Sequence, residues 1–99
     1  MKLNEIFEDR AGIYIIKNKI NEKYYIGESL NIKKRIYQHC YGGDQVLHKA
    51  IAKYGIDNFE IYVEYFDTFS KSDLIKLEES LIIKYNSLAP HGYNICSKG

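Results

Sequence analysis

Glu78 is a carboxylate that the sequence directs toward the protein interior. On a helix of 3.6 residues per turn it falls near the centre of an apolar stripe, which comprises Leu74, Leu77, Leu81 and Tyr85. An inward carboxylate is costly unless it is paired, hydrogen-bonded or bound to a metal. Two interpretations follow. If Glu78 is isolated, a buried contact with an arginine or tyrosine is favoured. If other catalytic side chains lie nearby, a role as an oxygen ligand for Mg²⁺ is favoured.

Two tyrosines and two residues of a predicted helix are candidate catalytic partners of this carboxylate. Tyr14 and Tyr25 lie in neighbouring predicted strands, and Arg35 and His39 are one helical turn apart. Hydrolysis of a phosphodiester needs a group that orients or deprotonates water, a cation for the phosphate charge and a metal for the oxygens. Tyrosine, histidine, arginine and one carboxylate are a sufficient set. Each residue alone also has an ordinary role: Tyr14 could serve in packing, Arg35 in a surface ion pair, and His39 as a helix-surface histidine.

The elements that position these groups begin with a hairpin. β-Branched and aromatic residues predict strands over 12–17 and 24–26, closed by Gly27 and joined by a polar turn at 18–23. These two strands are antiparallel because the turn is too short for a crossover. Alternating side chains predict a third strand over 59–67, whose place in the sheet the sequence leaves open.

Apolar residues at helical spacing predict three helices. They span about 30–41, with Ser29 or Asn31 as N-cap and Gly42-Gly43 as terminator, about 45–54, between Asp44 and Gly55, and about 73–85, capped by Ser70 or Ser72. A short closing segment at 91–95 follows the last helix. Three strands and three helices on one sheet predict a small α+β layer.

The length of 99 residues favours a single domain, 1–99. No apolar run reaches the length of a membrane span, and the polar N-terminus lacks the pattern of a signal peptide. Cys40 and Cys96 are far apart and are expected to be buried small hydrophobes in a reducing compartment. We therefore expect a cytoplasmic protein of a bacterial or phage-infected cell, without a membrane partner.

The charges are segregated although the formal net charge is only +1. Residues 17–35 hold six basic and two acidic side chains, whereas residues 57–79 hold seven acidic and two basic ones. The N-terminal third is suited to face a polyanion. The alternative, that both are simply solvated faces, is equally compatible with the charges alone.

Taken together, the motifs resemble the signature of the GIY-YIG nuclease family. The elements occur in the family's order: Gly12-Ile13-Tyr14, then after ten residues Tyr25-Ile26-Gly27, then Ser29, Arg35-x-x-x-His39, Glu78 and Gly92-Tyr93-Asn94-Ile95. The resemblance spans roughly residues 11–96 and is greatest to the catalytic domains of intron-encoded and phage homing endonucleases.

This resemblance implies a three-stranded antiparallel sheet flanked by helices and metal-dependent hydrolysis of DNA. It makes Glu78 the ligand of one divalent metal, Mg²⁺, for which Mn²⁺ can substitute. Tyr14 becomes the general base or water-orienting group, and Tyr25 supports it. A free tyrosine, with a pKa near 10, is a poor base, so the resemblance leaves the proton acceptor open.

The remaining roles follow from the same resemblance. Arg35 becomes a phosphate clamp, because its fork can grip two oxygens. His39 relays the proton or hydrogen-bonds Tyr14, and Asn94 orients a loop or the phosphate, with mere stabilisation of a turn as its ordinary role. The implied partner is duplex DNA. Homing enzymes usually join this domain to a separate DNA-recognition domain or partner protein, so the chain is expected to be either part of such an enzyme or a minimal nuclease with weak sequence preference.

Two departures from the family pattern stand out. Glu28 places a negative charge beside the implied phosphate site, and Ser80-Leu81 follows the glutamate where family members often have a bulky aromatic residue. A catalytically silent nucleic-acid-binding or accessory module on the same scaffold is therefore the alternative. A zinc protein is a third hypothesis, but its candidate ligands lack standard spacing: His39, Cys40, His48, His91 and Cys96.

Overall fold

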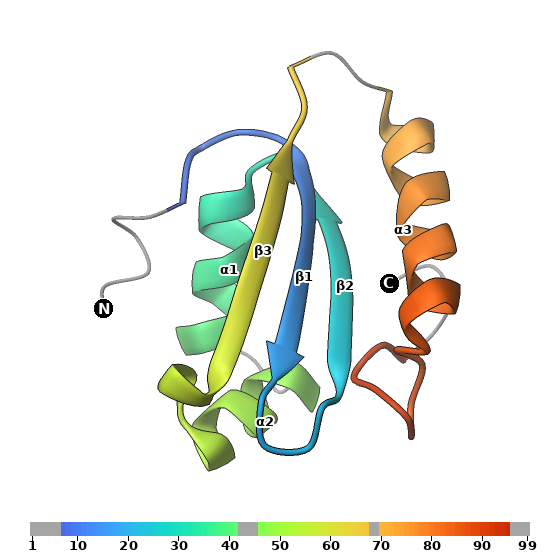
Figure 1. Ribbon diagram of the computed structural model, residues 1–99. Helices are drawn as coiled ribbons and strands as arrows, with labels where there is room; N and C mark the ends of the chain where they lie inside the picture. The colour runs from blue at the N-terminus through green and yellow to red at the C-terminus, as the bar shows by residue number, and fades with distance from the viewer. Residues whose placement is uncertain (1–6, 42–45, 68–69, 96–99) are drawn as a thin grey trace.

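A three-stranded antiparallel sheet forms the centre of the fold (Figure 1). The computed structural model describes residues 7–41, 46–67 and 70–95. The strands are β1 (Gly12–Asn18), β2 (Tyr24–Ser29) and β3 (Phe59–Tyr65). Their order is β2-β1-β3, so the first strand is central and the third pairs with its other edge. The expected α+β class and antiparallel sheet are confirmed, and the open question of the third strand is answered.

The register places the two tyrosine motifs side by side. Tyr14 of β1 lies opposite Gly27 of β2 and Val63 of β3, and Ile16 lies opposite Tyr25. Residues that are directly opposite in an antiparallel pair point to the same face. Tyr14, Gly27 and Tyr25 therefore share one face of the sheet.

The helices are α1 (Ile32–Tyr41), α2 (Val46–Tyr54) and α3 (Lys71–Tyr85), with a short 3₁₀ turn, η2, over Ile56–Asn58. They agree with the predicted helices except that α1 begins two residues later and α3 two residues earlier. Asn31 caps α1 through its side chain, which accepts the backbone N–H of Lys34. Ser70 caps α3 by accepting the N–H of Asp73. The predicted signals Gly42, Gly43 and Asp44 lie outside the described residues.

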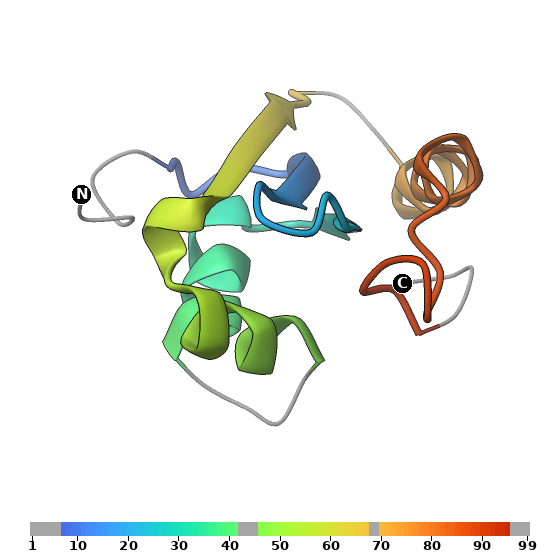
Figure 2. The same cartoon turned by 60° about the horizontal axis from the view of Figure 1, so that its bottom comes forward.

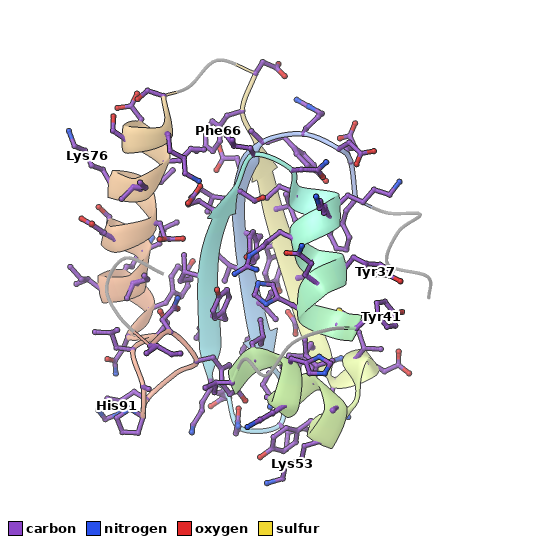
Figure 3. All side chains as sticks on the ribbon, turned by 180° about the vertical axis from the view of Figure 1, so that it is seen from behind. Tyr37, Tyr41, Lys53, Phe66, Lys76 and His91 are labelled. Carbon is purple, nitrogen blue, oxygen red and sulfur yellow. The ribbon has the colours of Figure 1, made fainter. Side chains whose placement is uncertain are left out.

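The helices are divided between the two sides of the sheet. Helices α1 and α2 cover one face, and α3 lies along the β2 edge (Figures 1 and 2). The core lies between the sheet and α1–α2, and its fully buried members include Tyr14, Ile16, Ile32, Ile36 and Leu47. On the outer surfaces, Tyr37 and Tyr41 project from α1 and Lys76 from α3 (Figure 3).

One predicted core position is wrong, because Leu77, assigned to the apolar stripe of its helix, is 37% exposed. Val46, the first residue of α2, is also exposed, at 42%. Both lie at the edge of the apolar face of their helix, where helical periodicity does not show how far the covering layer of the fold extends. Cys40 is half-buried, and Cys96 lies outside the described residues. In the described part of the chain, no helix is long and apolar enough to cross a membrane.

The segment after α3 returns to the outer edge of β2. Asn86 caps the C-terminal end of α3, where its left-handed conformation (φ 50°) lets its N–H reach the last helical carbonyls. Further along, the N–H of Tyr93 donates to the carbonyl of Tyr24 at 2.9 Å. This return brings the predicted closing segment against the strand that carries the second motif.

Candidate active site

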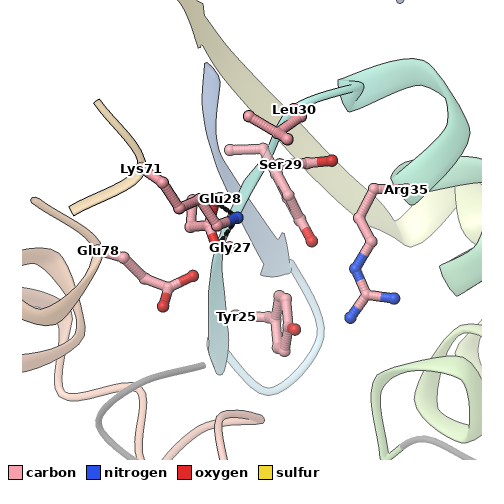
Figure 4. Close-up of a pocket in the computed structure, with 9 residues that line it drawn as sticks. Tyr25, Gly27, Glu28, Ser29, Leu30, Arg35, Lys71 and Glu78 are labelled. Atoms are coloured by element: carbon pink, nitrogen blue, oxygen red, sulfur yellow. Dashed lines mark hydrogen bonds and ion pairs between the residues drawn. The ribbon is translucent and has the colours of Figure 1, made fainter. Parts of the chain in front are cut away.

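A pocket of about 380 Å³ opens at the β2 edge of the sheet. Its walls come from both sides of that edge, because α1 contributes Arg35 and α3 contributes Lys71 and Glu78 (Figure 4). The complete lining is Tyr14, Tyr25, Gly27, Glu28, Ser29, Leu30, Arg35, Lys71 and Glu78. Four of the six predicted site residues therefore meet in one pocket, and they come from four elements, β1, β2, α1 and α3.

Tyr14 is held at the inner end of this pocket. Only 1% of the residue is exposed, and its hydroxyl lies 2.8 Å from Nε2 of His39. The Tyr25 ring stacks against it, with centroids 6.1 Å apart. Opposite Tyr14, a Cβ on Gly27 would lie 2.2 Å from the ring carbon Cζ, so only glycine leaves room for this ring. The spacing of the two motifs thus has a steric basis.

His39 reaches Tyr14 from α1 and is completely buried. Its ring also meets Tyr25 in an edge-on arrangement with centroids 4.9 Å apart. The alternative of a helix-surface histidine is therefore wrong. The pairing of His39 with the Tyr14 hydroxyl is one of the two roles that the family resemblance implied for this histidine.

Arg35 lies one turn before His39 and brings a positive charge to both tyrosines. Burial raises the pKa of Tyr14 well above its ordinary value and raises that of Tyr25 as well, while the guanidinium opposes both shifts. Burial prevails, so both phenols are neutral near pH 7. Arg35 can present its charge to an anion in the pocket, since it lines the wall next to these hydroxyls.

Glu78 is the buried carboxylate that the helical pattern predicted, with 3% of the residue exposed. Burial is the main cause that raises its pKa to about 7, followed by the charge of Glu28. The backbone N–H of Glu28 and the charge of Lys71 act in the opposite direction. Its atom Oε1 is buried and has no hydrogen-bond partner among the residues that the structure describes. The expected alternative of a buried pair with arginine or tyrosine leaves this oxygen unexplained.

The site fits a hard cation of the Mg²⁺ type. A carboxylate oxygen is its preferred protein ligand, and water and substrate phosphate usually complete the shell. In residues 7–41, 46–67 and 70–95, no group of three or more metal-ligand side chains occurs, so the zinc hypothesis gains no ligand cluster there. A single buried carboxylate beside an open pocket suits a metal that keeps most of its shell for water and phosphate.

Lys71 is the pocket residue that sequence reasoning missed. Its ammonium contacts both oxygens of Glu28, at 2.7 and 2.5 Å. The pair explains how the unexpected charge of Glu28 is tolerated beside the site. A signal was present in the sequence, because Lys71 and Glu78 are seven residues apart and so share one helix face. Its partner on β2, 43 residues earlier, was not visible.

Asn94, in contrast, does not line the pocket. Its Nδ2 donates to the carbonyl of Ile26, and its Oδ1 accepts the N–H of Ile26 and the hydroxyl of Ser87. The amide thus pairs with β2 as a neighbouring strand would.

The outer edge of β2 is covered along its length by three residues. Alternate residues of a strand, here positions 24, 26 and 28, present their backbone groups to the same edge. Tyr93 bonds Tyr24 and Asn94 bonds Ile26, so the closing segment covers this edge up to the point where Glu78 faces Glu28. This geometry suits a positioning residue and does not bring Asn94 to a phosphate.

The family model described as the GIY-YIG catalytic domain matches residues 10–94. A probable intron-encoded endonuclease of Neurospora crassa is 34% identical over 88 residues, covering 82% of this chain and 29% of that protein. The chain spans between 14% and 29% of the length of the first curated relatives that it matches.

Solved structures agree with this match. The catalytic domain of the homing endonuclease I-TevI aligns with a TM-score of 0.72 and 29% identity, covering 88% of this chain and 99% of that one. The N-terminal endonuclease domain of UvrC from Thermotoga maritima, bound to magnesium, shares the fold with a TM-score of 0.66 and 22% identity, covering 96% of this chain and 100% of that one. With the hairpin motifs, the pocket and the family match in agreement, the chain belongs to the GIY-YIG catalytic domain family.

Proposed function

We propose that the chain is the nuclease unit of a metal-dependent DNA endonuclease that hydrolyses phosphodiester bonds. One observation carries the proposal: within the described part of the chain, the buried Oε1 of Glu78 lacks a hydrogen-bond partner, and its pocket is also lined by Arg35 and Tyr14. A binding module that needed no metal would gain nothing from an orphaned carboxylate oxygen, which costs free energy. An enzyme recovers that cost when a cation binds.

Relatives support both DNA and magnesium as its ligands. The similar protein from Neurospora crassa and I-TevI are named as endonucleases, and the UvrC domain holds magnesium as its catalytic divalent cation. Mn²⁺, another hard cation, is expected to substitute. The net charge of +1 is low for tight DNA binding by the domain alone. We therefore also propose that a separate DNA-recognition region or partner supplies most of the affinity.

The residues divide the chemistry among them. Glu78 would hold the divalent cation, which when bound supplies positive charge to the phosphate oxygens and to water. Arg35 binds and orients the phosphate through its fork of N–H donors. The hydroxyl oxygen of Tyr14 takes the proton of the attacking water while its own proton passes to Nε2 of His39, 2.8 Å away. This transfer avoids a buried tyrosinate. As the water oxygen bonds to phosphorus, the P–O bond to the leaving oxygen breaks, and that oxygen takes a proton from solvent.

A cleavage assay tests the proposal. Supercoiled plasmid is incubated with the purified chain and a titration of Mg²⁺, and nicked and linear products are separated on a gel. We expect Glu78→Ala and Arg35→Ala to lose about two or more orders of magnitude in rate, since each group contributes several kcal/mol and ~1.4 kcal/mol is tenfold.

Matched controls come from neighbouring positions. Glu79→Ala removes the adjacent carboxylate on α3, and Lys34→Ala removes the adjacent exposed cation on α1; both variants should cut like wild type. If wild-type protein cuts no better than Glu78→Ala, the endonuclease proposal fails. Metal-independent DNA binding without cleavage would then support the catalytically silent module.

A further inference from the structure

Glu28 and Glu78 form the carboxylate side of the pocket. In β2, Gly27 shares the face of Tyr14, so the next residue, Glu28, points to the opposite face, toward α3. Its side chain is only 13% exposed. Figure 4 shows Lys71 in contact with Glu28, with the carboxylate of Glu78 beside this pair. The two carboxylates therefore face the same space from different elements.

The charges of this cluster are unevenly satisfied. Both oxygens of Glu28 contact the ammonium of Lys71, whereas no group in residues 7–41, 46–67 or 70–95 hydrogen-bonds the buried Oε1 of Glu78. Both carboxylates line the same pocket, so their negative charges repel each other. A lysine that neutralises one carboxylate leaves an incomplete site, and a cation between the two would complete it.

We propose that Glu28 supplies a second carboxylate to the divalent cation that Glu78 holds, and that Lys71 is a tethered cation which this metal displaces from Glu28. The inference rests on the proposed function of the pocket. Mg²⁺ and Mn²⁺ accept two carboxylates in one shell. Their double charge balances both carboxylates, which the single charge of Lys71 does not.

Lys71 is suited to such an exchange. It lies in the first turn of α3 on a flexible four-carbon stem, and its side chain is 52% exposed. Ion pairs of a half-exposed lysine are weak, so the ammonium can return to water at little cost. The competing explanation is a clamp, in which the Lys71–Glu28 pair only fixes the start of α3 to β2.

Metal binding measured without DNA separates the two explanations. Free Mn²⁺ is counted by electron paramagnetic resonance during titration of wild type, Glu28→Asp, Glu28→Gln, Lys71→Met and Glu78→Gln, with circular dichroism to verify folding. Glu28→Asp keeps the charge but withdraws the oxygens by one methylene. If Glu28 is a ligand, Glu28→Asp and Glu28→Gln should both weaken binding by about tenfold.

Lys71→Met removes the competing ammonium and should tighten Mn²⁺ binding by about threefold or more. Lys76→Met, a more distant and exposed position on the same helix, and Glu64→Gln, an exposed carboxylate on β3, control for net charge and should change little. The inference is overturned if Glu28→Asp binds as wild type does, or if Lys71→Met fails to bind more tightly.

Failure of the underlying function gives a different result. If wild type and Glu78→Gln bind Mn²⁺ equally, Glu78 is no metal ligand and the proposed function itself is wrong. If Glu78→Gln loses binding while Glu28→Asp retains it, the metal site stands with a single carboxylate and only the present inference is lost.

Discussion

The hydroxyl of Tyr14 lies 2.8 Å from Nε2 of His39, and both residues are almost completely buried. The pair joins the central strand to α1 and ends at the pocket that contains Glu78 and Arg35. Burial keeps the phenol neutral, so the histidine is the group that can receive its proton. Tyr14 and His39 are therefore expected to act as one unit.

Substitutions of the pair should be non-additive. Tyr14→Phe removes the hydroxyl and should lower the rate of DNA cleavage by about 10²–10⁴-fold, the range for a lost general base. His39→Gln should lower it as well, and the double variant should be no slower than the slower single variant. Single-turnover cleavage measures each rate, with Tyr37→Phe on the exposed face of α1 as control. If the rate loss of the double variant equals the product of the two single rate losses, the residues act independently.

Gly27→Ala should inactivate the protein by displacing Tyr14. The added Cβ would lie 2.2 Å from Cζ of the Tyr14 ring, which is buried against Tyr25 and His39 and cannot move without loss of its contact with His39. We expect overpacking to lower the free energy of unfolding by about 1–3 kcal/mol. We also expect a loss of cleavage activity larger than this loss of stability alone would cause. Thermal unfolding and cleavage are compared at a temperature where the variant remains folded; full activity there would contradict the steric argument.

Glu78→Gln should stabilise the metal-free protein at neutral and alkaline pH. The folded-state pKa of about 7 lies above the ordinary 4.5, so the folded protein holds the extra proton and its stability falls as pH rises from about 4.5 to 7. That loss amounts to about 3 kcal/mol, and Gln does not incur it. Denaturant unfolding of both proteins at pH 4.5 and 8 measures the difference.

Magnesium provides the control for this measurement. It should stabilise wild type at pH 8 by binding the folded state, and it should leave Glu78→Gln unchanged. An equal pH dependence for the two proteins would show that another group causes the loss.

Asn94→Ala should destabilise the fold. The substitution leaves the buried N–H and carbonyl of Ile26 and the hydroxyl of Ser87 without their partner. Each costs about 1–3 kcal/mol, so the free energy of unfolding should fall by about 3 kcal/mol or more. Asn21→Ala, an exposed asparagine whose bonds water can replace, should cost far less. Thermal melting tests both, and a small effect of Asn94→Ala would show that β2 needs no closure at this edge.

Local patterns in the sequence determined the parts of this protein that local forces shape. The inward position of Glu78 follows from helical periodicity alone, because neighbouring apolar residues fix which face is buried. The hairpin and the Arg35–His39 pair follow in the same way, and the order of the motifs was sufficient to indicate the family. Caps such as Asn31 and Ser70 were among the predicted candidates, since they act within one turn.

Tertiary structure alone decided the contacts between residues distant in sequence. It placed β3 against β1, paired Glu28 with Lys71, and gave the Asn94 amide to Ile26 and not to the pocket. Periodicity says which side of an element is buried, but not which other element covers it, because many pairings bury the same apolar area equally well. The site depends on one such pairing, in which α3 meets the open edge of β2 and brings Glu78 to the tyrosines.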